Sequence, residues 1–287
     1  MASDFPKVLN DDPALIRAEV IAEYEAETNK KLYPAQSDNF PLNELAYRES
    51  LTKSQFNAAN KQNYVRWATG TLLEALGEFW GVWRLPEEKD DKFRIRILLA
   101  PESLTSTGTR GAYEFFIRSV DPIISAVSFD NPNPGSGTVR SYILTDNGLP
   151  TEELLARVYQ KVTSTEIMVM GVAYEVKAPE IVYYDFKFKV VVAHGYDKQS
   201  IKKQVLIALQ GIADEDGNKV QDGFIDTLQK TLGHDVVLSQ FTEVIQKITG
   251  VHSVTIETPT ADINLTAGQW PVNRSVEVTV VEQSEEH

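Results

Sequence analysis

Side chains that commonly bind metals or carry protons are few in this sequence. Its 287 residues include four histidines and no cysteine. The histidines show no His-x-x-x-His spacing, and no carboxylate stands at a ligand spacing from them. The sequence therefore predicts no metal site and no histidine acting as an acid or base. These histidines are His194, His234, His252 and His287.

Three loop segments resemble ligand-binding loops, and each has a simpler interpretation. DEDGN (214–218) lacks the spaced aspartates and the later glutamate of a calcium loop, so it predicts a solvated turn. PGSGT (134–138) has no lysine after it, unlike a phosphate-binding loop, and predicts a hairpin turn. GYDKQS (195–200) starts a helix that could hold an anion, although capping by Asp197 is favoured.

Nucleophilic catalysis has no recognisable motif here, since neither a Ser/His/Asp arrangement nor Gly-x-Ser-x-Gly occurs. The sequence predicts a protein that is not an enzyme and has no cofactor. Lysine and arginine number 28 against 41 aspartates and glutamates, a net charge of −13. Nucleic-acid binding needs clustered cations, so this balance argues against it.

No apolar run reaches the roughly 20 residues of a membrane span. The first residues, MASDFPKVLNDDP, lack the basic and apolar parts of a secretory signal. We therefore expect a soluble, acidic chain that stays inside the cell that makes it.

Two helices are expected to dominate the amino-terminal region. Asp12 before Pro13 predicts the start of a helix that runs to about residue 32. Residues 42–68 contain no proline or glycine and predict a helix of about 27 residues, roughly 40 Å long. Its apolar positions are sparse, so it must gain stability by packing in this chain or against another.

The segment WATGTLLEALGEFWGVWRLP (67–86) holds three of the four tryptophans. Thr71 and Glu74 predict a capping box for a short helix. Leu72, Leu76, Phe79 and Trp83 follow at helical spacing, with Leu73 and Trp80 alongside. This spacing favours packing, in a core or an interface, over a sugar-binding platform. We expect Trp80 or Trp83 inside this chain and Trp67 against a neighbouring helix.

The remaining sequence mixes helices and strands. The charged run 86–91 predicts a connector, followed by helices that end at Pro101 and Pro122. Segments 124–130 and 138–145 predict a hairpin, and 151–162 an amphipathic helix. Residues 181–193 alternate as a half-buried strand, with Tyr184, Phe186, Phe188, Val190 and Val192 on one side. Helices at 200–212 and from Ser239 to Gly250 precede strands at 251–257 and 274–282.

These elements predict an α+β fold: a helical amino-terminal arm, then two small α+β domains with helices packed on mixed or antiparallel sheets. The expected boundaries are 1–85 for the arm, 86–165 for a small domain with the hairpin, and 166–287 for the carboxyl-terminal domain.

Four segments follow one another in the chain: LYPAQSDNFPLNELAYRESL, WATGTLLEALGEFWGVWRLP, FRIRILLAPESLTSTGTRGAYEFF and LSQFTEVIQKITGVHSVTIETPTADINL. In this order they resemble the baseplate J-like family, and more narrowly the gpJ-type baseplate proteins of contractile-tailed phages and related particles. Each is a weak pattern alone, but their order and spacing are specific. The family's junction pattern matches here at Ala68, Thr69, Gly70, Leu73, Leu76, Gly77, Gly81, Val82 and Arg84.

Two features depart from the family pattern. The short step from Leu85 to Phe93 leaves no room for the β-domain that many J-like proteins insert there. The hydrophilic insert at 213–223 is also more acidic than the resemblance implies.

The resemblance implies a structural role in the baseplate wedge of a contractile tail. Two copies of a J-like chain and one gpI-like chain would form a heterotrimer through a helical bundle, with a gpW-like, lysozyme-like-fold protein as a further partner. The α+β domains would link neighbouring wedges around the spike-bearing hub. The location would be the baseplate of a virion or tail-like particle, assembled in the bacterial host cytoplasm. Neither nucleic acid nor membrane is an expected partner.

We expect contacts with partner helices at five residues of the long helix, and a hinge at Gly70 with the connector 86–91. The interface residues are Leu45, Leu51, Phe56, Tyr64 and Trp67. The alternative function is a carbohydrate- or small-ligand-binding module that uses Trp80 and Trp83. A cell-wall hydrolase is disfavoured because no pair of carboxylates stands in a suitable context.

Overall fold

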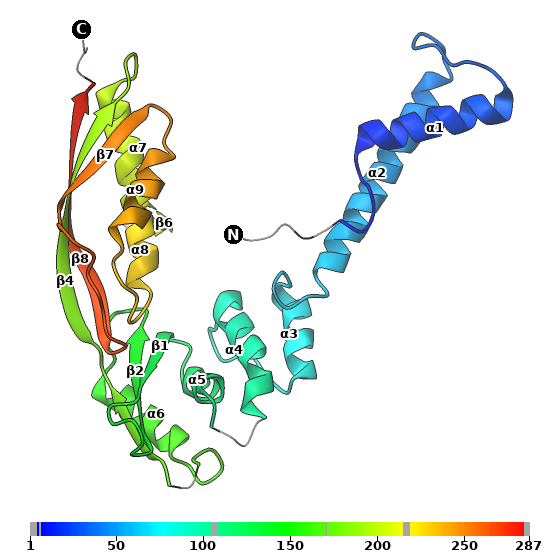
Figure 1. Cartoon of the computed structure of the whole chain (residues 1–287). Coiled ribbons are helices and arrows are strands. Elements are labelled where there is room, and N and C mark those ends of the chain that lie inside the picture. The colour runs from blue at the N-terminus through cyan, green and yellow to red at the C-terminus, as the bar shows by residue number, and fades with distance from the viewer. Residues whose placement is uncertain (1–4, 6, 105–107, 170, 215–218, 284–287) are drawn as a thin grey trace. The chain divides into compact units, whose positions relative to one another are not determined.

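A computed structural model describes residues 5, 7–104, 108–169, 171–214 and 219–283. The chain divides into two compact units, Met1–Pro101 and Glu102–His287, called here the N-terminal and C-terminal units. The N-terminal unit is helical, and the C-terminal unit combines helices with small sheets (Figure 1). The predicted α+β class is thus confirmed. The expected division into three parts stays a prediction.

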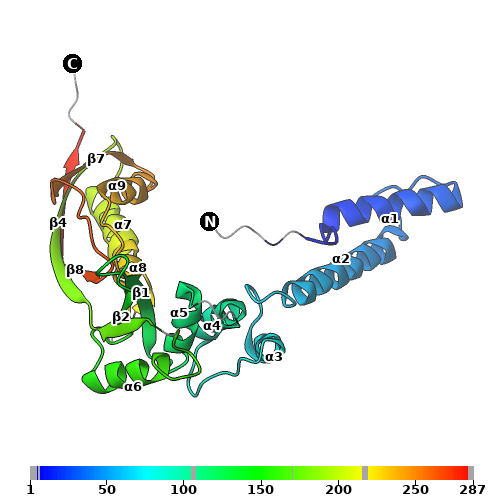
Figure 2. The ribbon, with the colours of Figure 1, turned by 60° about the horizontal axis from the view of Figure 1, so that its bottom comes forward.

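Two helices that pack together open the N-terminal unit: α1 (Pro13–Thr28) and α2 (Asn39–Lys61) (Figure 2). As predicted, Asp12 caps α1, because its Oδ1 accepts a 2.9 Å hydrogen bond from the Ala14 N–H. α1 ends four residues before the expected residue 32, where Asn29 adopts a left-handed conformation. Few apolar side chains are buried on these helices, namely Ile16 and Ala46.

The expected extent of the second helix, 42–68, is wrong at both ends. Helix α2 starts three residues earlier, with Pro41 in its first turn, where a missing N–H has no cost. It ends at Lys61, and the chain continues in turns. Asparagine side chains compete for backbone hydrogen bonds, and Asn60 and Asn63 stand at this end. Tyr64 and Trp67 therefore lie beyond the helix.

Helices α3 (Gly70–Phe79) and α4 (Asp90–Ser103) pack through a close approach. A Cβ atom on Gly77 would lie 2.6 Å from the Phe93 ring and 2.8 Å from the Val82 carbonyl oxygen. Only glycine fits there. The predicted stop of α4 at Pro101 is two residues early, since the proline lies inside the last turn. The buried apolar residues are Leu73, Val82, Phe93, Ile97 and Ala100.

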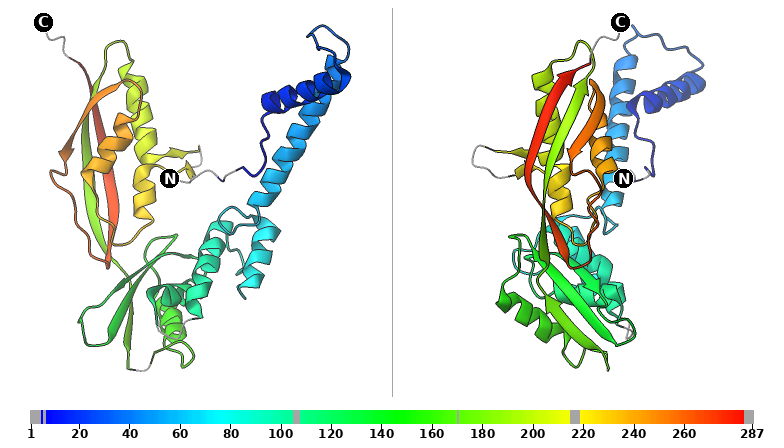
Figure 3. Two further views of the ribbon diagram at one scale, coloured as in Figure 1. Left: turned by 45° about the vertical axis from the view of Figure 1, so that its right-hand side comes forward. Right: turned by 60° about the vertical axis from the view of Figure 1, so that its left-hand side comes forward.

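The C-terminal unit starts with α5 (Arg110–Arg118) and a central sheet of β1 (Ile124–Asp130), β2 (Thr138–Thr145) and β3 (Ala173–Lys177), in the order β1-β2-β3. β1 and β2 form the predicted antiparallel hairpin. β3, which was not predicted, lies parallel to β2 after the crossover helix α6 (Glu152–Val162). Helices α5 and α6 cover one face of this sheet (Figure 3). The buried core between the helices and the sheet includes Ile117, Ile143, Leu154, Val158 and Val162.

The C-terminal sheet has the order β7-β4-β8, from β4 (Glu180–Val192), β7 (Val251–Thr258) and β8 (Gln269–Glu282). β4 runs parallel to β8 and antiparallel to β7. Helices α7 (Lys198–Gln210), α8 (Phe224–Gln229) and α9 (Leu238–Gln246) lie on one face (Figures 1 and 3). The predicted inward side of β4 is confirmed, since all five residues are buried: Tyr184, Phe186, Phe188, Val190 and Val192.

One local prediction for this region fails, the helix cap at Ser239. Ser239 does not cap α9; the first N–H of that helix, on Leu238, instead donates a 2.8 Å bond to Asp262 Oδ1, from 24 residues away. The hydrophilic insert at 213–223 contains most of a short, exposed hairpin of β5 (Ile212–Ala213) and β6 (Lys219–Gln221), which does not contradict its hydrophilic character. Most of DEDGN falls at 215–218, outside the described residues.

Trp270 joins the two larger sheets of the C-terminal unit. Its ring packs on a small buried cluster made of Ala126 and Leu144 from the central sheet and Leu232 from the segment after α8. The indole N–H donates a 2.7 Å hydrogen bond to the Gln229 carbonyl oxygen. Within the described residues, no helix is long and apolar enough to cross a membrane.

Candidate functional site

The exposed apolar side chains of α2 form the first part of the candidate site. Three predicted interface residues lie on this helix, and their exposed fractions are 54% for Leu45, 44% for Leu51 and 51% for Phe56. These residues do not share one side of the helix. Leu45 and Phe56 are eleven residues apart, which is about three turns, so both lie on the same side of the helix. Leu51 is rotated from them by roughly 120° or more around the helix axis.

Leu51 belongs to a second row that sequence reasoning did not assemble. Phe40, Tyr47, Leu51 and Ala58 are spaced by seven, four and seven residues, which places them along one side of a helix. All four are exposed, Phe40 to 79% and Tyr47 to 55%. We call Leu45 and Phe56 the first row and these four residues the second row.

The third side of α2 is polar and holds the segment before α1. The Asn57 side chain is buried; its Oδ1 accepts hydrogen bonds from the Val8 and Leu9 N–H groups, and its Nδ2 donates to the Leu9 carbonyl oxygen. Ser50 Oγ donates a 2.7 Å bond to the Asp11 carbonyl oxygen. Sequence reasoning missed these contacts, because their partners lie 39 to 49 residues away.

The other two predicted interface residues, Tyr64 and Trp67, form an aromatic cluster with Phe5 after the helix. Ring centroids are 5.2 Å apart for Phe5 and Tyr64 and 5.0 Å for Phe5 and Trp67. Tyr64 remains 50% exposed, and Trp67 is half-buried. This cluster lies within the chain, so Trp67 already packs on a residue of its own N-terminal segment.

The aromatic side chains after α3 face solvent, which contradicts the expectation that Trp80 or Trp83 lies inside. Their exposed fractions are 41% and 68%, and Phe79 reaches 80%. The expected inward row was built on Leu72, which is exposed, whereas the neighbouring positions Leu73 and Gly77 are buried. The helix turns its glycine inward because Phe93 needs the space that a side chain would fill.

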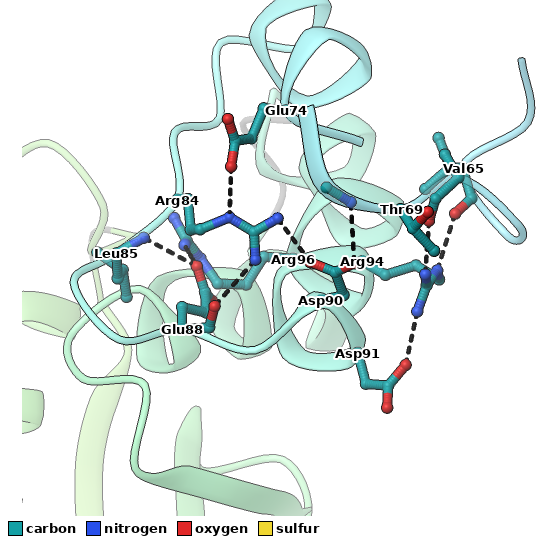
Figure 4. Close-up of polar contacts among 12 residues, drawn as sticks. Val65, Thr69, Glu74, Arg84, Leu85, Glu88, Asp90, Asp91, Arg94 and Arg96 are labelled. Atoms are coloured by element: carbon teal, nitrogen blue, oxygen red, sulfur yellow. Dashed lines mark hydrogen bonds and ion pairs between the residues drawn. The ribbon is translucent and has the colours of Figure 1, made fainter. Parts of the chain in front are cut away.

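A polar network fixes the junction between α3 and α4 (Figure 4). Arg84 donates to Glu74 Oε1 at 2.9 Å, to Asp90 Oδ1 at 2.7 Å and to the Glu88 carbonyl oxygen at 2.9 Å. Glu74 is thus an ion-pair partner, and the predicted capping box with Thr71 is wrong, since Thr69 is the N-cap residue. The guanidinium group of Arg84 also lies 4.6 Å from the Phe93 ring centroid.

A buried ion pair lies beside this network (Figure 4). Arg96 Nη1 lies 2.7 Å from Glu88 Oε2, and the two side chains are 6% and 1% exposed. Burial lowers the pKa of Arg96, and the adjacent carboxylate opposes that shift. The run 86–91, expected as a charged connector, thus contains one buried carboxylate, that of Glu88. The only sequence signal was a glutamate eight residues before an arginine.

Gly70, the predicted hinge, has a left-handed φ of 55°. Its N–H donates a 3.0 Å hydrogen bond to Asp90 Oδ2. This backbone donor, together with Arg84, lowers the pKa of Asp90. Gly70 is therefore tied to the start of α4 in this structure. No finding tests whether it moves.

Metal-ligating side chains do not gather in the part of the chain that the structure describes. There, no group of three or more histidines, aspartates or glutamates could hold a metal ion. Asp197 caps α7, accepting a 2.7 Å bond from the Ser200 N–H, as favoured for GYDKQS. PGSGT lies in the β1–β2 turn, as predicted. The prediction of a non-enzyme stays a prediction.

Comparison with known proteins identifies the family. The model of the baseplate J-like central domain matches residues 105–178, and that of the baseplate J-like protein C-terminal domain matches 184–279, together more than half of the chain. The chain belongs to the baseplate J-like family. Membership gives it a structural role in a baseplate, and both matches fall in the C-terminal unit.

Two known proteins are similar to this chain. The chain is 26% identical to baseplate protein J of Escherichia phage P2 over 243 residues, which cover 79% of this chain and 76% of the relative. A cryo-EM structure of the anti-feeding prophage baseplate matches with a TM-score of 0.43 and 16% identity. That match covers 67% of this chain and 43% of the baseplate chain, so this chain spans less than half of the length of that protein.

Proposed function

We propose that this chain is a structural component of the baseplate wedge of a contractile tail. In this proposal it assembles with a second copy of itself and with gpI-like and gpW-like baseplate chains, and it links wedges around the hub. Its location is the tail baseplate, after assembly in the host cytoplasm. It acts mechanically and catalyses no reaction.

One observation supports the proposal most strongly: α2 carries apolar side chains on two sides that nothing in the described chain covers. The polar third side holds α1 and the segment before it. The first and second rows stand roughly 120° or more apart. A helix with three such sides fits the centre of a helical bundle, with one partner helix on each row.

The five predicted interface residues enter the proposal with different partners. Leu45 and Phe56 serve one partner helix, and Leu51 serves the other with Phe40 and Tyr47. Tyr64, which is half exposed, extends the contact beyond the helix, and Trp67 supports it from the aromatic cluster. Such large apolar side chains are enriched in the centres of interfaces.

Gly70 is the proposed hinge between this bundle and the rest of the chain. Movement there requires release of its hydrogen bond to Asp90, which is a single contact at the surface. Its positive φ is open to glycine at no steric cost, so the backbone there has more freedom than elsewhere.

Co-expression with the neighbouring reading frames tests the proposal. The wild-type chain is expected to purify as a complex of defined stoichiometry. Leu51→Asp and Phe56→Asp should each remove one partner, because burying an unpaired charge in an apolar interface is unfavourable. Arg48→Asp is the matched control, because Arg48 is exposed on α2 and lies about 60° or more around the helix axis from every residue of both rows; it should leave the complex intact. A folded monomer without affinity for any baseplate chain would refute the proposal.

A carbohydrate-binding module is the second candidate, and the exposure of Trp80 and Trp83 favours it. Exposed indole faces stack on sugar rings. Saturable glycan binding that Trp83→Ala abolishes, while the complex still assembles, would establish this alternative.

A further inference from the structure

Two open grooves of opposite charge lie on different units of the chain. The first, called the acidic groove, has a volume of about 530 Å³ and belongs to the N-terminal unit. One wall is a two-turn side of α3, and the other contains Trp83, 68% exposed, above the buried Phe93. The α3 wall is made of Thr71, Glu74, Ala75 and Glu78.

The acidic groove contains a carboxylate that has no ion pair. Arg84 is the cation of the lining, but it already binds Glu74 and Asp90. Glu78, one turn further along α3, forms no ion pair with any described residue. A free carboxylate beside an exposed indole suits a lysine side chain, whose ammonium pairs with the acid while its stem packs on the ring.

The second groove, called the lysine groove, runs along the outer side of α7 in the C-terminal unit and has a volume of about 330 Å³. Lys202 and Lys203 line it, next to the aliphatic Leu206 and Ile207. Neither lysine forms an ion pair with a described residue. Other lysines of the same unit do, namely Lys198, Lys219 and Lys230.

Apolar surface continues beside the lysine groove on the β5–β6 hairpin. Ile212 is 39% exposed and Val220 is 68% exposed. The lining of the groove repeats at three- and four-residue steps over α7, so it presents one continuous helical side. The lysine groove therefore presents two ammonium groups beside aliphatic side chains. The acidic groove presents the carboxylate of Glu78 beside the indole of Trp83.

We propose that the lysine groove of one copy of this chain docks on the acidic groove of a second copy. The occupant is a second copy because both complementary surfaces occur in this chain: a free carboxylate beside an exposed indole, and two unpaired lysines beside aliphatic side chains. The contact joins two different surfaces, so in a pair of copies one lysine groove and one acidic groove remain free, and further copies can bind there. This deepens the proposed function, on which it rests, by naming a surface through which copies connect.

Single cysteines test the contact, since the chain has none of its own. Glu78→Cys and Lys202→Cys variants are purified separately, one carrying a size tag, and mixed with a short thiol crosslinker. A crosslinked heterodimer is expected. The control pairs Glu78→Cys with Lys189→Cys, an exposed lysine on the solvent side of β4, and should give no such product.

Charge reversal supplies a second measurement. Sedimentation of the full chain from about 1 μM to about 0.3 mM should show self-association. Glu78→Lys alone, or Lys202→Glu with Lys203→Glu, should weaken it about tenfold, and combining all three should restore it. Lys189→Glu should have no effect.

Two results would overturn the proposal: no heterodimer crosslink, or no recovery of self-association in the combined variant. Co-purification with other baseplate chains is scored separately. If that complex persists while the crosslink fails, the groove contact is refuted and the proposed function stands.

Discussion

Glu88 and Arg96 show how one buried pair holds the junction between α3 and α4. Besides its ion pair, Glu88 accepts a 2.9 Å hydrogen bond from the Leu85 N–H, and Arg96 donates to the Trp83 carbonyl oxygen at 3.2 Å. The two side chains therefore fasten the backbone on both sides of Arg84. This arrangement presents Trp83 to solvent, because its backbone is fixed while its ring has no partner in the core.

Replacing Glu88 by alanine tests this role. Glu88→Ala should lower the free energy of unfolding of the N-terminal unit by about 3–5 kcal/mol, because Arg96 would remain buried without its carboxylate. Urea denaturation followed by tryptophan fluorescence measures it, since three of the four tryptophans lie in this unit. The control Lys89→Ala, at an exposed position next to it, should change stability by less than about 0.5 kcal/mol. Equal effects of the two variants would contradict the role.

At the scale of elements, periodicity predicted the buried side chains best where the surface that covers them belongs to this same chain. The alternation of β4 identified its buried residues, because β4 covers a core that this chain builds by itself. For α3 the same reasoning failed. Hydrophobic spacing favoured Leu72, Phe79 and Trp83, whereas the structure buries Leu73 and Gly77. Periodicity indicates which side chains favour burial, but not which chain will cover them.

The candidate site was predictable in part for the same reason. Leu45, Leu51 and Phe56 were selected as apolar residues on a polar helix, and all three are exposed. Their division into two rows depended on where α1 packs. That choice is made by Asn57 and Ser50, whose hydrogen bonds reach a segment far away in sequence. No local pattern encodes such a contact.

At the scale of elements, the connection between α7 and β5 is expected to require glycine at position 211. It has a φ of 77°, and a Cβ there would lie 2.0 Å from the Gln221 carbonyl oxygen. Gly211→Ala should therefore lower the free energy of unfolding by at least about 2 kcal/mol, from backbone strain and from this clash. Gly195→Ala is the matched control, with a φ of 87° and no atom within 4 Å. Chemical denaturation measures both, and equal losses would show that only the φ value matters.

At the scale of the whole molecule, the C-terminal unit matches the family models and the N-terminal unit carries the uncovered apolar rows. The proposed mechanical role requires parts of the chain that remain stiff between the points where it bends. Within the C-terminal unit, the central and C-terminal sheets meet at Trp270. Ser128 Oγ also donates to the Ala267 carbonyl oxygen, and a Cβ on Gly268 would lie 2.5 Å from the Tyr142 ring.

These contacts predict that the two sheets unfold together and move as one body. Trp270→Ala removes the ring from the shared cluster and the hydrogen bond to Gln229, a loss of about 3–5 kcal/mol. Calorimetry should then resolve two transitions where the wild-type unit has one, and amide exchange should protect β1 and β4 to different extents. Trp270→Phe keeps a ring in the cluster and loses the hydrogen bond, about 1–2 kcal/mol, so its unit should still unfold in one step. If the alanine variant also retains a single transition, the sheets are coupled by Gly268 and Ser128 rather than by Trp270.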